Sequence, residues 1–326
     1  MTSRFPFTSF PISWYRVAAG SDLPVGKVQT LRYFGRDLVL FRTEDGKAHA
    51  LDAHCPHVGA HLGWGGKIVG NTLQCPFHGW CIDGDGTCVK IPYCEKIPPS
   101  ARTRSWPVHE VNGQIMIYHD PSDGQPQWQI PEFPEYNSPE WTSFTPGYHW
   151  TIRTHVQELG ENGMDSAHFS FLHTQQTLRM RTEAVEIDGP RLIHRTFQYY
   201  NVFGLAKFLV SEVTGPLDIT LYGLGCAVNR TCVDAKLKLF YTFAFYFTPL
   251  DEEHTEIHSM LSMKKMSFPF ANNLLLRKAI REGKRTIDQD LPIWENKVYR
   301  DRPRLCEADG PIMQYRKWAS QFYAAS

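Results

Sequence analysis

Two short segments of this 326-residue chain combine cysteine and histidine at spacings that suit a metal. The first segment pairs Cys55 with His57, and the second, seventeen residues later, pairs Cys75 with His78. Thiolate sulfur suits zinc and iron–sulfur clusters, while imidazole suits iron, zinc and copper. The residue types therefore predict a metal site and leave zinc open.

The way the ligands are paired separates these interpretations. A zinc finger places two cysteines in one pair and two histidines in the other, whereas each pair here holds one of each. A Rieske-type [2Fe–2S] cluster has one iron on two cysteines and one on two histidines, so each pair must reach both irons. The mixed pairs favour such a cluster, and a Cys2His2 zinc site is the alternative.

A second candidate set lies at 154–172, where few breakers interrupt a stretch that predicts a helix. His168 and His173 are five positions apart, about 140° around an ideal helix, so they share one metal only if the helix ends or bends there. From the pair alone, a metal site and a plain role as core or capping residues are equally good interpretations of the two histidines. A mononuclear iron site of this kind needs two histidines and one carboxylate, with open positions for oxygen.

The third ligand is sought near the C-terminus, where helices are predicted at 272–281 and 286–299. On the second helix, Ile287, Leu291, Trp294 and Val298 fall on one face. Two carboxylates flank that face, at roughly 70° from its centre on one side and roughly 90° on the other. They are Asp290 and Asp288 respectively, and periodicity allows either to point inward.

Composition sets broader limits. The chain has 34 basic and 34 acidic residues and a net charge of zero, which gives no sign of nucleic acid or acidic membrane as a partner. The opening residues lack the pattern of a secretory signal, and the longest apolar run, 240–247, is too short to span a bilayer. The six remaining cysteines show no disulfide framework, and a labile cluster suits a reducing compartment, so we expect a cytoplasmic protein.

Strand patterns divide the chain into two parts. Before the boundary, alternating runs separated by turn residues predict a β-meander, with the cysteine and histidine pairs in its loops. A Pro- and Gly-rich stretch at 121–134 marks the boundary, which gives domains 1–134 and 135–326. The second part predicts a sizeable antiparallel sheet. The predicted strands are 14–18, 27–33, 37–42, 87–93 and 114–119, then 191–200, 217–224, 236–248 and 255–264. Aromatic residues at strand spacing fill cores first, and those that are also candidates to line a substrate pocket are Phe197, Tyr199, Phe203, Phe240 and Phe245.

With these motifs in view, the chain resembles the Rieske non-haem iron oxygenases over nearly its whole length. The cluster segment has the oxygenase form, because Ala60 and Phe77 stand where respiratory Rieske proteins carry an extra disulfide. The stretch 161–173 resembles the family's mononuclear iron motif. Within the family, the chain is most similar to ketosteroid 9α-hydroxylases and cholesterol 7-desaturases, a likeness carried by residues 65–70, 101–106, 289–294 and 314–323.

The resemblance implies an α+β fold. An all-β Rieske domain precedes a helix-grip-like antiparallel sheet whose helices hold mononuclear iron. It also implies roles for nine residues. Cys55 and Cys75 would hold one cluster iron and His57 and His78 the other; His168, His173 and Asp290 would hold the mononuclear iron; Asn162 and Asp165 would assist catalysis, with Asp165 bridging a cluster histidine of one subunit to an iron histidine of the next in a head-to-tail trimer.

The activity implied is oxygenation with O2, on Fe(II), with electrons that NAD(P)H supplies through a separate ferredoxin or flavin reductase. The expected substrate is hydrophobic, possibly steroid-like, and is hydroxylated or desaturated. An aromatic-ring dioxygenase is the alternative among enzymes, and a Rieske-type electron-transfer protein is the alternative outside them. Two departures stand out: Val58 occupies a position where many members have Arg, which leaves the reduction potential open, and the membrane segment of the animal desaturases is absent.

Overall fold

The structure is a computed structural model that describes residues 4–7, 9–174, 177–200, 213–234 and 237–323. The chain divides into two compact units. The cluster unit consists of Ile12–Pro131 with Thr248–Glu252. The sheet unit consists of the described parts of Met1–Pro11, Glu132–Phe247 and Glu253–Ser326. The two are described separately below.

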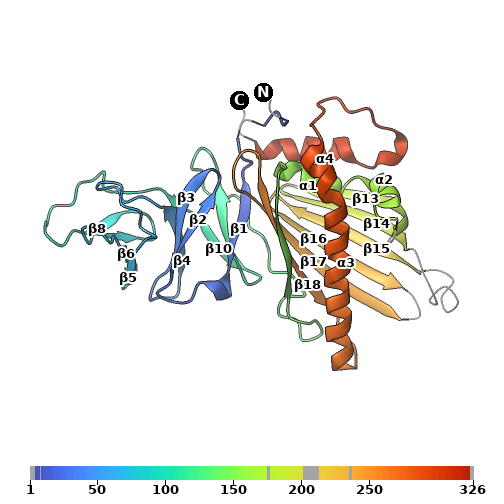
Figure 1. Ribbon diagram of the computed structural model, residues 1–326, viewed down its shortest axis with the longest axis horizontal. Coiled ribbons are helices and arrows are strands. Elements are labelled where there is room, and N and C mark those ends of the chain that lie inside the picture. The colour runs from blue at the N-terminus through green and yellow to red at the C-terminus, as the bar shows by residue number, and fades with distance from the viewer. Residues whose placement is uncertain (1–3, 8, 175–176, 201–212, 235–236, 324–326) are drawn as a thin grey trace. The chain divides into compact units, whose positions relative to one another are not determined.

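Three small antiparallel sheets build the cluster unit (Figure 1). Short strands alternate with turn residues here, as predicted. In the hairpin of β2 and β3, Phe34 and Gly35 both have positive φ, +54° and +68°, which is the turn that matches strand twist. The sheets are β1 (Ser13–Ala19), β11 (Gln114–His119) and β10 (Val108–Val111); β2 (Val28–Tyr33), β3 (Arg36–Arg42), β4 (Ala48–Asp52) and β9 (Ser105–Trp106); and β5 (Lys67–Val69), β6 (Thr72–Gln74), β7 (Cys81–Asp83) and β8 (Cys88–Lys90).

A buried cluster of apolar side chains backs the loops that carry the cysteine and histidine pairs. Phe41 and Leu51 come from the larger sheet, and Leu73 and Ile82 from the smaller one. Cys55 and Cys75 belong to the same buried cluster. The core therefore fixes the base of both loops.

The sheet unit is built on seven antiparallel strands with helices, so the predicted α+β class is confirmed. The helix α3 packs against β12 and β18, and α2 packs against β13 (Figure 1). In sheet order the strands are β12 (Thr145–Ile152), β18 (Thr255–Met263), β17 (Lys238–Pro249), β16 (Cys226–Asp234), β15 (Val213–Tyr222), β14 (Arg191–Tyr200) and β13 (Thr177–Asp188); the helices are α1 (Val156–Asn162), α2 (Ser166–Phe171), α3 (Pro269–Asn296) and α4 (Ile312–Ala319).

Two helix predictions were wrong in their bounds. The single helix predicted at 154–172 is two helices, because the Asp165 carboxylate accepts hydrogen bonds from the amides of Ala167 and His168 and begins α2 anew. The two helices predicted after residue 272 are one. Gly283 does not interrupt α3, since a glycine costs a helix only about 1 kcal/mol and a side chain there would press on Phe243.

Candidate metal centres

The candidate cluster ligands stand on two loops with the same backbone hydrogen bonds. In the first loop the Cys55 amide donates to the Ala60 carbonyl at 2.9 Å, and the Gly59 amide donates to the Cys55 carbonyl at 3.0 Å. In the second loop Cys75 makes the same two bonds, at 2.8 and 3.1 Å, with the residues five and four positions later. Gly59 has φ +79° and its counterpart Gly79 has φ +72°, a conformation that favours glycine.

The donor atoms on these loops fit a Rieske-type cluster. Cys55 and Cys75 are buried and form no disulfide, and the rings of His57 and His78 lie 4.7 Å apart. Nδ1 of each histidine is buried without a hydrogen-bond partner. Two thiols and two unpartnered imidazole nitrogens are the ligand set of such a cluster. Burial raises the pKa of the Cys55 thiol to about 11, so metal binding must displace its proton.

Trp80 orients one of these histidines, a role that the sequence analysis missed. Its ring stacks on that of His57 with centroids 4.5 Å apart and an interplanar angle of 11°. Its Nε1 donates a hydrogen bond to the Tyr93 hydroxyl at 2.9 Å. The tryptophan two residues after His78 was the available signal. Val58, beside His57, is 61% exposed.

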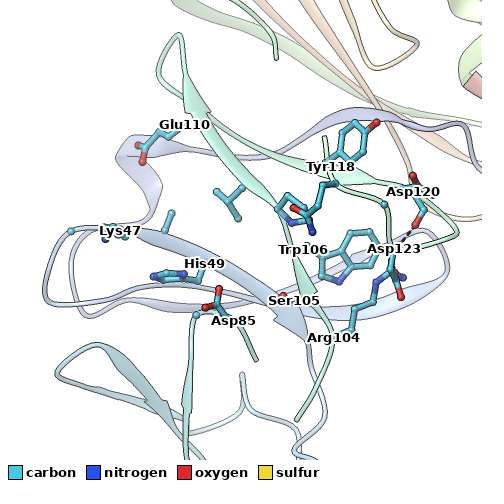
Figure 2. A pocket seen from close by; sticks show the side chains of 17 residues that line it. Lys47, His49, Asp85, Arg104, Ser105, Trp106, Glu110, Tyr118, Asp120 and Asp123 are labelled. Carbon is cyan, nitrogen blue, oxygen red and sulfur yellow. Dashed lines mark hydrogen bonds and ion pairs between the residues drawn. The ribbon is translucent and has the colours of Figure 1, made fainter. Parts of the chain in front are cut away.

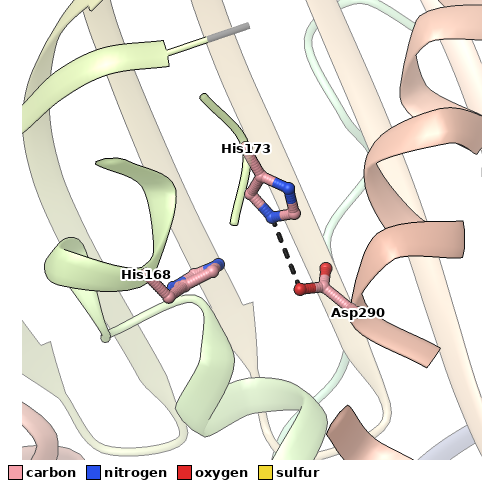
Figure 3. A group of neighbouring side chains, drawn as sticks. All are labelled: His168, His173 and Asp290. Atoms are coloured by element: carbon pink, nitrogen blue, oxygen red, sulfur yellow. Dashed lines mark ion pairs between the residues drawn. The ribbon is translucent and has the colours of Figure 1, made fainter. Parts of the chain in front are cut away.

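The second site brings His168, His173 and Asp290 together, with ligand atoms that all lie within 4.8 Å of one another. His168 belongs to α2, and His173 follows after that helix has ended at Phe171, so the condition for sharing one metal is met. Figure 3 shows Asp290 reaching from α3 toward His173. His173 Nε2 and Asp290 Oδ1 lie 3.4 Å apart, both are buried, and neither has a hydrogen-bond partner. The residues present fit a mononuclear iron with two histidines and one carboxylate.

Hydrogen bonds on the far side of each ring fix the two imidazoles. His168 Nδ1 donates to the Asp165 carbonyl at 2.6 Å, and His173 Nδ1 donates to Gln289 Oε1 at 2.9 Å. A nitrogen that faces a carbonyl must carry the proton, so Nε2 of each ring keeps its lone pair for a metal. The Asn162 amide nitrogen lies 3.3 Å from His168 Nε2, at the edge of the site.

Electrostatics differ between the two histidines. Burial lowers the pKa of His168. Burial also acts to lower the pKa of His173, but the nearby Asp290 carboxylate and the hydrogen bond to Gln289 raise it overall. A metal cation bound at the trio would compete with protons for Nε2 of both rings.

Asp288 points elsewhere and is already occupied. Its carboxylate accepts from Trp150 Nε1 at 3.0 Å and pairs with Lys284 one turn earlier on α3. Asp290, by contrast, is only 2% exposed and belongs to the trio. Packing thus separates two carboxylates that helical periodicity left equivalent.

The trio opens into a largely apolar cavity of about 640 Å³. Its walls come from α3 and from β14 to β17 of the sheet. Of the five aromatic residues predicted for the pocket, Phe245 lines it, while Phe197, Tyr199 and Phe240 do not, and Phe203 lies outside the described residues. On the inner face of β16, Asn229 Oδ1 is buried without a hydrogen-bond partner.

The cluster unit has a cleft of similar size, about 560 Å³, drawn in Figure 2. Its main cation is already neutralised, since Arg104 pairs with Asp123 at 2.6 Å, donates to the Asp120 carbonyl and stacks on Trp106 at 4.1 Å. None of the buried polar atoms without a partner in the described chain lies on this cleft. The candidate for chemistry is therefore the cavity of the sheet unit.

Comparison with known proteins follows the same division of the chain. Residues 13–107 match the family described as "Rieske [2Fe-2S] domain", and residues 117–323 match "3-Ketosteroid 9alpha-hydroxylase C-terminal domain". The chain is 33% identical to a cholesterol 7-desaturase of Ciona intestinalis, over 96% of this chain and 69% of that one. It is 32% identical to a probable 3-ketosteroid-9-alpha-monooxygenase oxygenase component of Rhodococcus rhodochrous, over 95% and 79%.

Among solved structures, the chain is similar to dicamba monooxygenase bound to dicamba. The TM-score is 0.74 with 23% identity, over 96% of this chain and 97% of that one, which establishes a shared fold. Within the described residues, no helix is both long and apolar enough to cross a membrane.

Proposed function

Since this chain belongs to the Rieske non-haem iron oxygenases, which use a [2Fe–2S] cluster, mononuclear iron, O2 and electrons from a separate reductase, we propose that it hydroxylates or desaturates a large apolar, steroid-like substrate. The observation that supports this most is the opening of the His168, His173 and Asp290 trio into an apolar cavity. Its volume of about 640 Å³ falls in the range of small-molecule sites, and apolar walls suit a fused-ring hydrocarbon.

The named relatives act on a ketosteroid and on cholesterol, and both substrate types carry an oxygen on an apolar skeleton. The unpartnered Asn229 amide oxygen on the cavity wall supplies an acceptor for a substrate hydroxyl. A buried acceptor left unpaired costs about 1–3 kcal/mol, so pairing it favours a substrate with a hydroxyl at that place.

We assign residues 1–134 to the cluster domain and 135–326 to the catalytic domain. In the first, Cys55, Cys75, His57 and His78 hold the [2Fe–2S] cluster; in the second, His168, His173 and Asp290 hold Fe(II). When bound, the iron supplies O2 binding and reduction beside the substrate. The chain's own part is to hold both imidazoles with Nε2 unprotonated, to keep Asn162 at the edge of the site, and to surround the substrate with apolar walls that exclude water.

The overall reaction balances for both outcomes. Hydroxylation takes one O2, two electrons and two protons, and inserts one oxygen atom into a C–H bond while the other leaves as water. Desaturation takes the same equivalents and removes two hydrogens from neighbouring carbons, with both oxygen atoms leaving as water. The electron donor is proposed to be a ferredoxin or flavin reductase that draws on NAD(P)H, and the compartment to be the cytoplasm.

The trio is tested by single substitutions. We expect His168→Ala, His173→Ala and Asp290→Ala each to abolish product formation from steroids and to lower iron from three to two per chain, the two of the cluster, while the reduced cluster keeps its paramagnetic signal. Asp288→Ala is the matched control and should retain iron, because its carboxylate already pairs with Lys284.

Equal loss of iron in Asp288→Ala would contradict the choice of ligand. The substrate class has its own test, a product screen over sterols, ketosteroids and aromatic acids. Dihydroxylated products from aromatic acids alone would point instead to an aromatic-ring dioxygenase. Wild-type protein with only two irons per chain would point to an electron-transfer protein.

We also propose a cyclic homotrimer in which Asp165 bridges a cluster histidine of one subunit to His168 of its neighbour. Only Asp165 Oδ1 caps α2, with bonds of 3.0 and 3.1 Å, and the side chain is 33% exposed. The second carboxylate oxygen, Oδ2, makes no capping bond and lies 3.9 Å from His168 Nδ1, which supports its proposed role as the bridging atom. A ring of identical interfaces closes without leaving a free end.

For this bridge, Asp165→Asn should keep both metals and the trimer, since Asn also caps helices. Electron transfer from cluster to iron should slow by orders of magnitude, measured as single-turnover reoxidation of the cluster. Near-normal reoxidation in this variant, or an active monomer in light scattering, would contradict the bridge.

A further inference from the structure

One region of the sheet unit is basic although the whole chain has no net charge. Between Glu256 and Glu282 the sequence has no acidic residue. Residues 264–281, called the docking segment below, run from just after the end of β18 through the first half of α3. The five basic residues of the docking segment are Lys264, Lys265, Arg277, Lys278 and Arg281.

Large apolar side chains stand exposed in the same segment. Phe268, Phe270 and Leu274 are 62%, 78% and 71% exposed, and the two phenylalanine rings lie 6.5 Å apart. At the start of the segment, Phe240 of β17, which is 38% exposed, lies beside Lys264, because its carbonyl accepts from the Lys264 amide at 3.0 Å. A contiguous exposed apolar patch of this kind marks an interaction surface.

Helical periodicity orders these residues along one face of α3. Phe270, Leu274, Arg277 and Arg281 follow at spacings of four, three and four, so the apolar side chains occupy the first turns and the guanidinium groups the next. Arg277, Lys278 and Arg281 are exposed and have no acidic partner within the described residues. Lys264 differs, since it pairs with Glu140 at 3.0 Å. Apolar residues flanked by unpaired cations are typical of helices that enter the surface of an anionic bilayer.

The same stretch of α3 also borders the substrate cavity. Leu275, Ala279 and Gly283 line the cavity from the inner side of the helix. Lys278 both lines the cavity and is exposed, so the cavity reaches the surface beside the docking segment. A substrate that is poorly soluble in water could then pass directly from a lipid phase into the cavity beside the docking segment.

We propose that residues 264–281 dock the protein on the surface of an anionic lipid bilayer, with Phe268, Phe270 and Leu274 inserted and Arg277 and Arg281 at the phosphates. A bilayer suits these observations better than a protein partner, because all charged residues of the segment are basic and its unpaired cations follow the apolar side chains along α3. The role in substrate entry rests on the proposed function, whereas docking itself needs no turnover.

Vesicle flotation tests the docking. We expect the purified holoenzyme to float with vesicles of phosphatidylcholine and phosphatidylglycerol, much less with phosphatidylcholine alone, and less again at high salt. Phe268→Ser/Phe270→Ser should weaken partitioning by about tenfold or more through lost apolar burial. Arg277→Glu/Arg281→Glu should weaken it by more than about 25-fold, since each basic residue near an anionic surface contributes about fivefold.

Matched controls carry the same changes elsewhere on the sheet unit. Met313→Ser removes an exposed apolar side chain on α4, and Arg304→Glu reverses an exposed charge outside the segment. Both should float like the wild type. The proposal would be overturned if the wild type failed to float or if all variants floated equally. It would also be overturned if light scattering showed a change of oligomeric state in Phe268→Ser/Phe270→Ser, because the surface would then bind a second copy of the chain.

Substrate delivery separates the docking from the proposed reaction. With steroid loaded in vesicles, the docking variants should turn over more slowly than the wild type; with steroid delivered from cyclodextrin, all should match it. Equal rates from vesicles in variants that no longer float would overturn the route of entry. Normal flotation with no steroid product from either source would overturn the proposed function and leave the docking intact.

Discussion

At the scale of single residues, the site depends on which nitrogen of each histidine carries a proton. A backbone carbonyl sets the protonated nitrogen of His168, and the side chain of Gln289 sets that of His173. The two are not equivalent, because a backbone carbonyl survives any substitution while a side-chain acceptor can be removed. Gln289 is therefore a position at which the proposed iron site can be perturbed without changing one of its proposed ligands.

Gln289→Leu should lower iron retention by about 10- to 100-fold, the usual effect of losing a group that orients a metal-binding histidine. Without its acceptor, the His173 ring is free to protonate Nε2 and to turn. Iron per chain after dialysis against a chelator measures the loss, and unchanged cluster absorbance is the internal control. Gln289→Glu should restore retention, because it keeps an acceptor; retention in Gln289→Leu equal to the wild type would show that the ring is held by packing.

At the scale of elements, the sheet is tied to the segment that enters it by an ion pair between a half-buried arginine and a buried glutamate. Arg230 of β16 donates two hydrogen bonds to the Glu135 carboxylate, at 2.6 and 3.1 Å, and Thr242 of β17 adds a third at 3.1 Å. Although burial acts to raise it, the pKa of Glu135 is lowered below its ordinary 4.5, because Arg230 and Thr242 stabilise the charged form. Folding thus stabilises the charged form of the Glu135 carboxyl.

Glu135→Gln should lower the free energy of unfolding by about 1–3 kcal/mol near neutral pH, because it removes the carboxylate charge that the half-buried Arg230 pairs with. A carboxyl whose folded pKa is depressed contributes stability above its unfolded pKa and loses it as pH falls through the folded value. The difference between wild type and variant in denaturant unfolding should therefore shrink as pH falls below about 4.5. A difference that is the same at all pH values would contradict the assignment of the effect to this charge.

Element by element, the sequence predicted types better than bounds. Strands β14 and β18 were predicted within a residue, because their alternation is regular and turn residues flank them. The division of α1 from α2 was not predicted. The sequence alone does not show whether Asp165 caps a new helix or lies within a continuous one. The choice between Asp288 and Asp290 also required tertiary packing, namely Trp150 and Lys284 around the former.

At the scale of the whole molecule, the two candidate metal centres belong to different compact units. The cluster loops are supported by their own apolar core, and the trio by α2 and α3. Each metal site should therefore assemble on its own. Loss of the metal from one site is expected to abolish catalysis while the other site keeps its metal.

Cys55→Ser and His78→Ala should each bleach the brown cluster absorbance and remove the paramagnetic signal of the reduced cluster. The mononuclear iron should remain, which leaves one iron per chain once the two of the cluster are gone. Iron analysis with spectroscopy measures both quantities in one sample. A normal cluster signal in either variant would contradict the ligand assignment, and loss of all iron would contradict independent assembly.

The matched hydrogen bonds of the two cysteine loops bear on how such a protein is made and repaired in a cell. Each loop is closed by amides and carbonyls of its own backbone and by a glycine that permits the turn. Because these bonds need no metal ligand, we expect the two loops to keep their conformation when the cluster is lost. A new cluster, delivered by an assembly protein after oxidative damage, should then insert without unfolding of the chain.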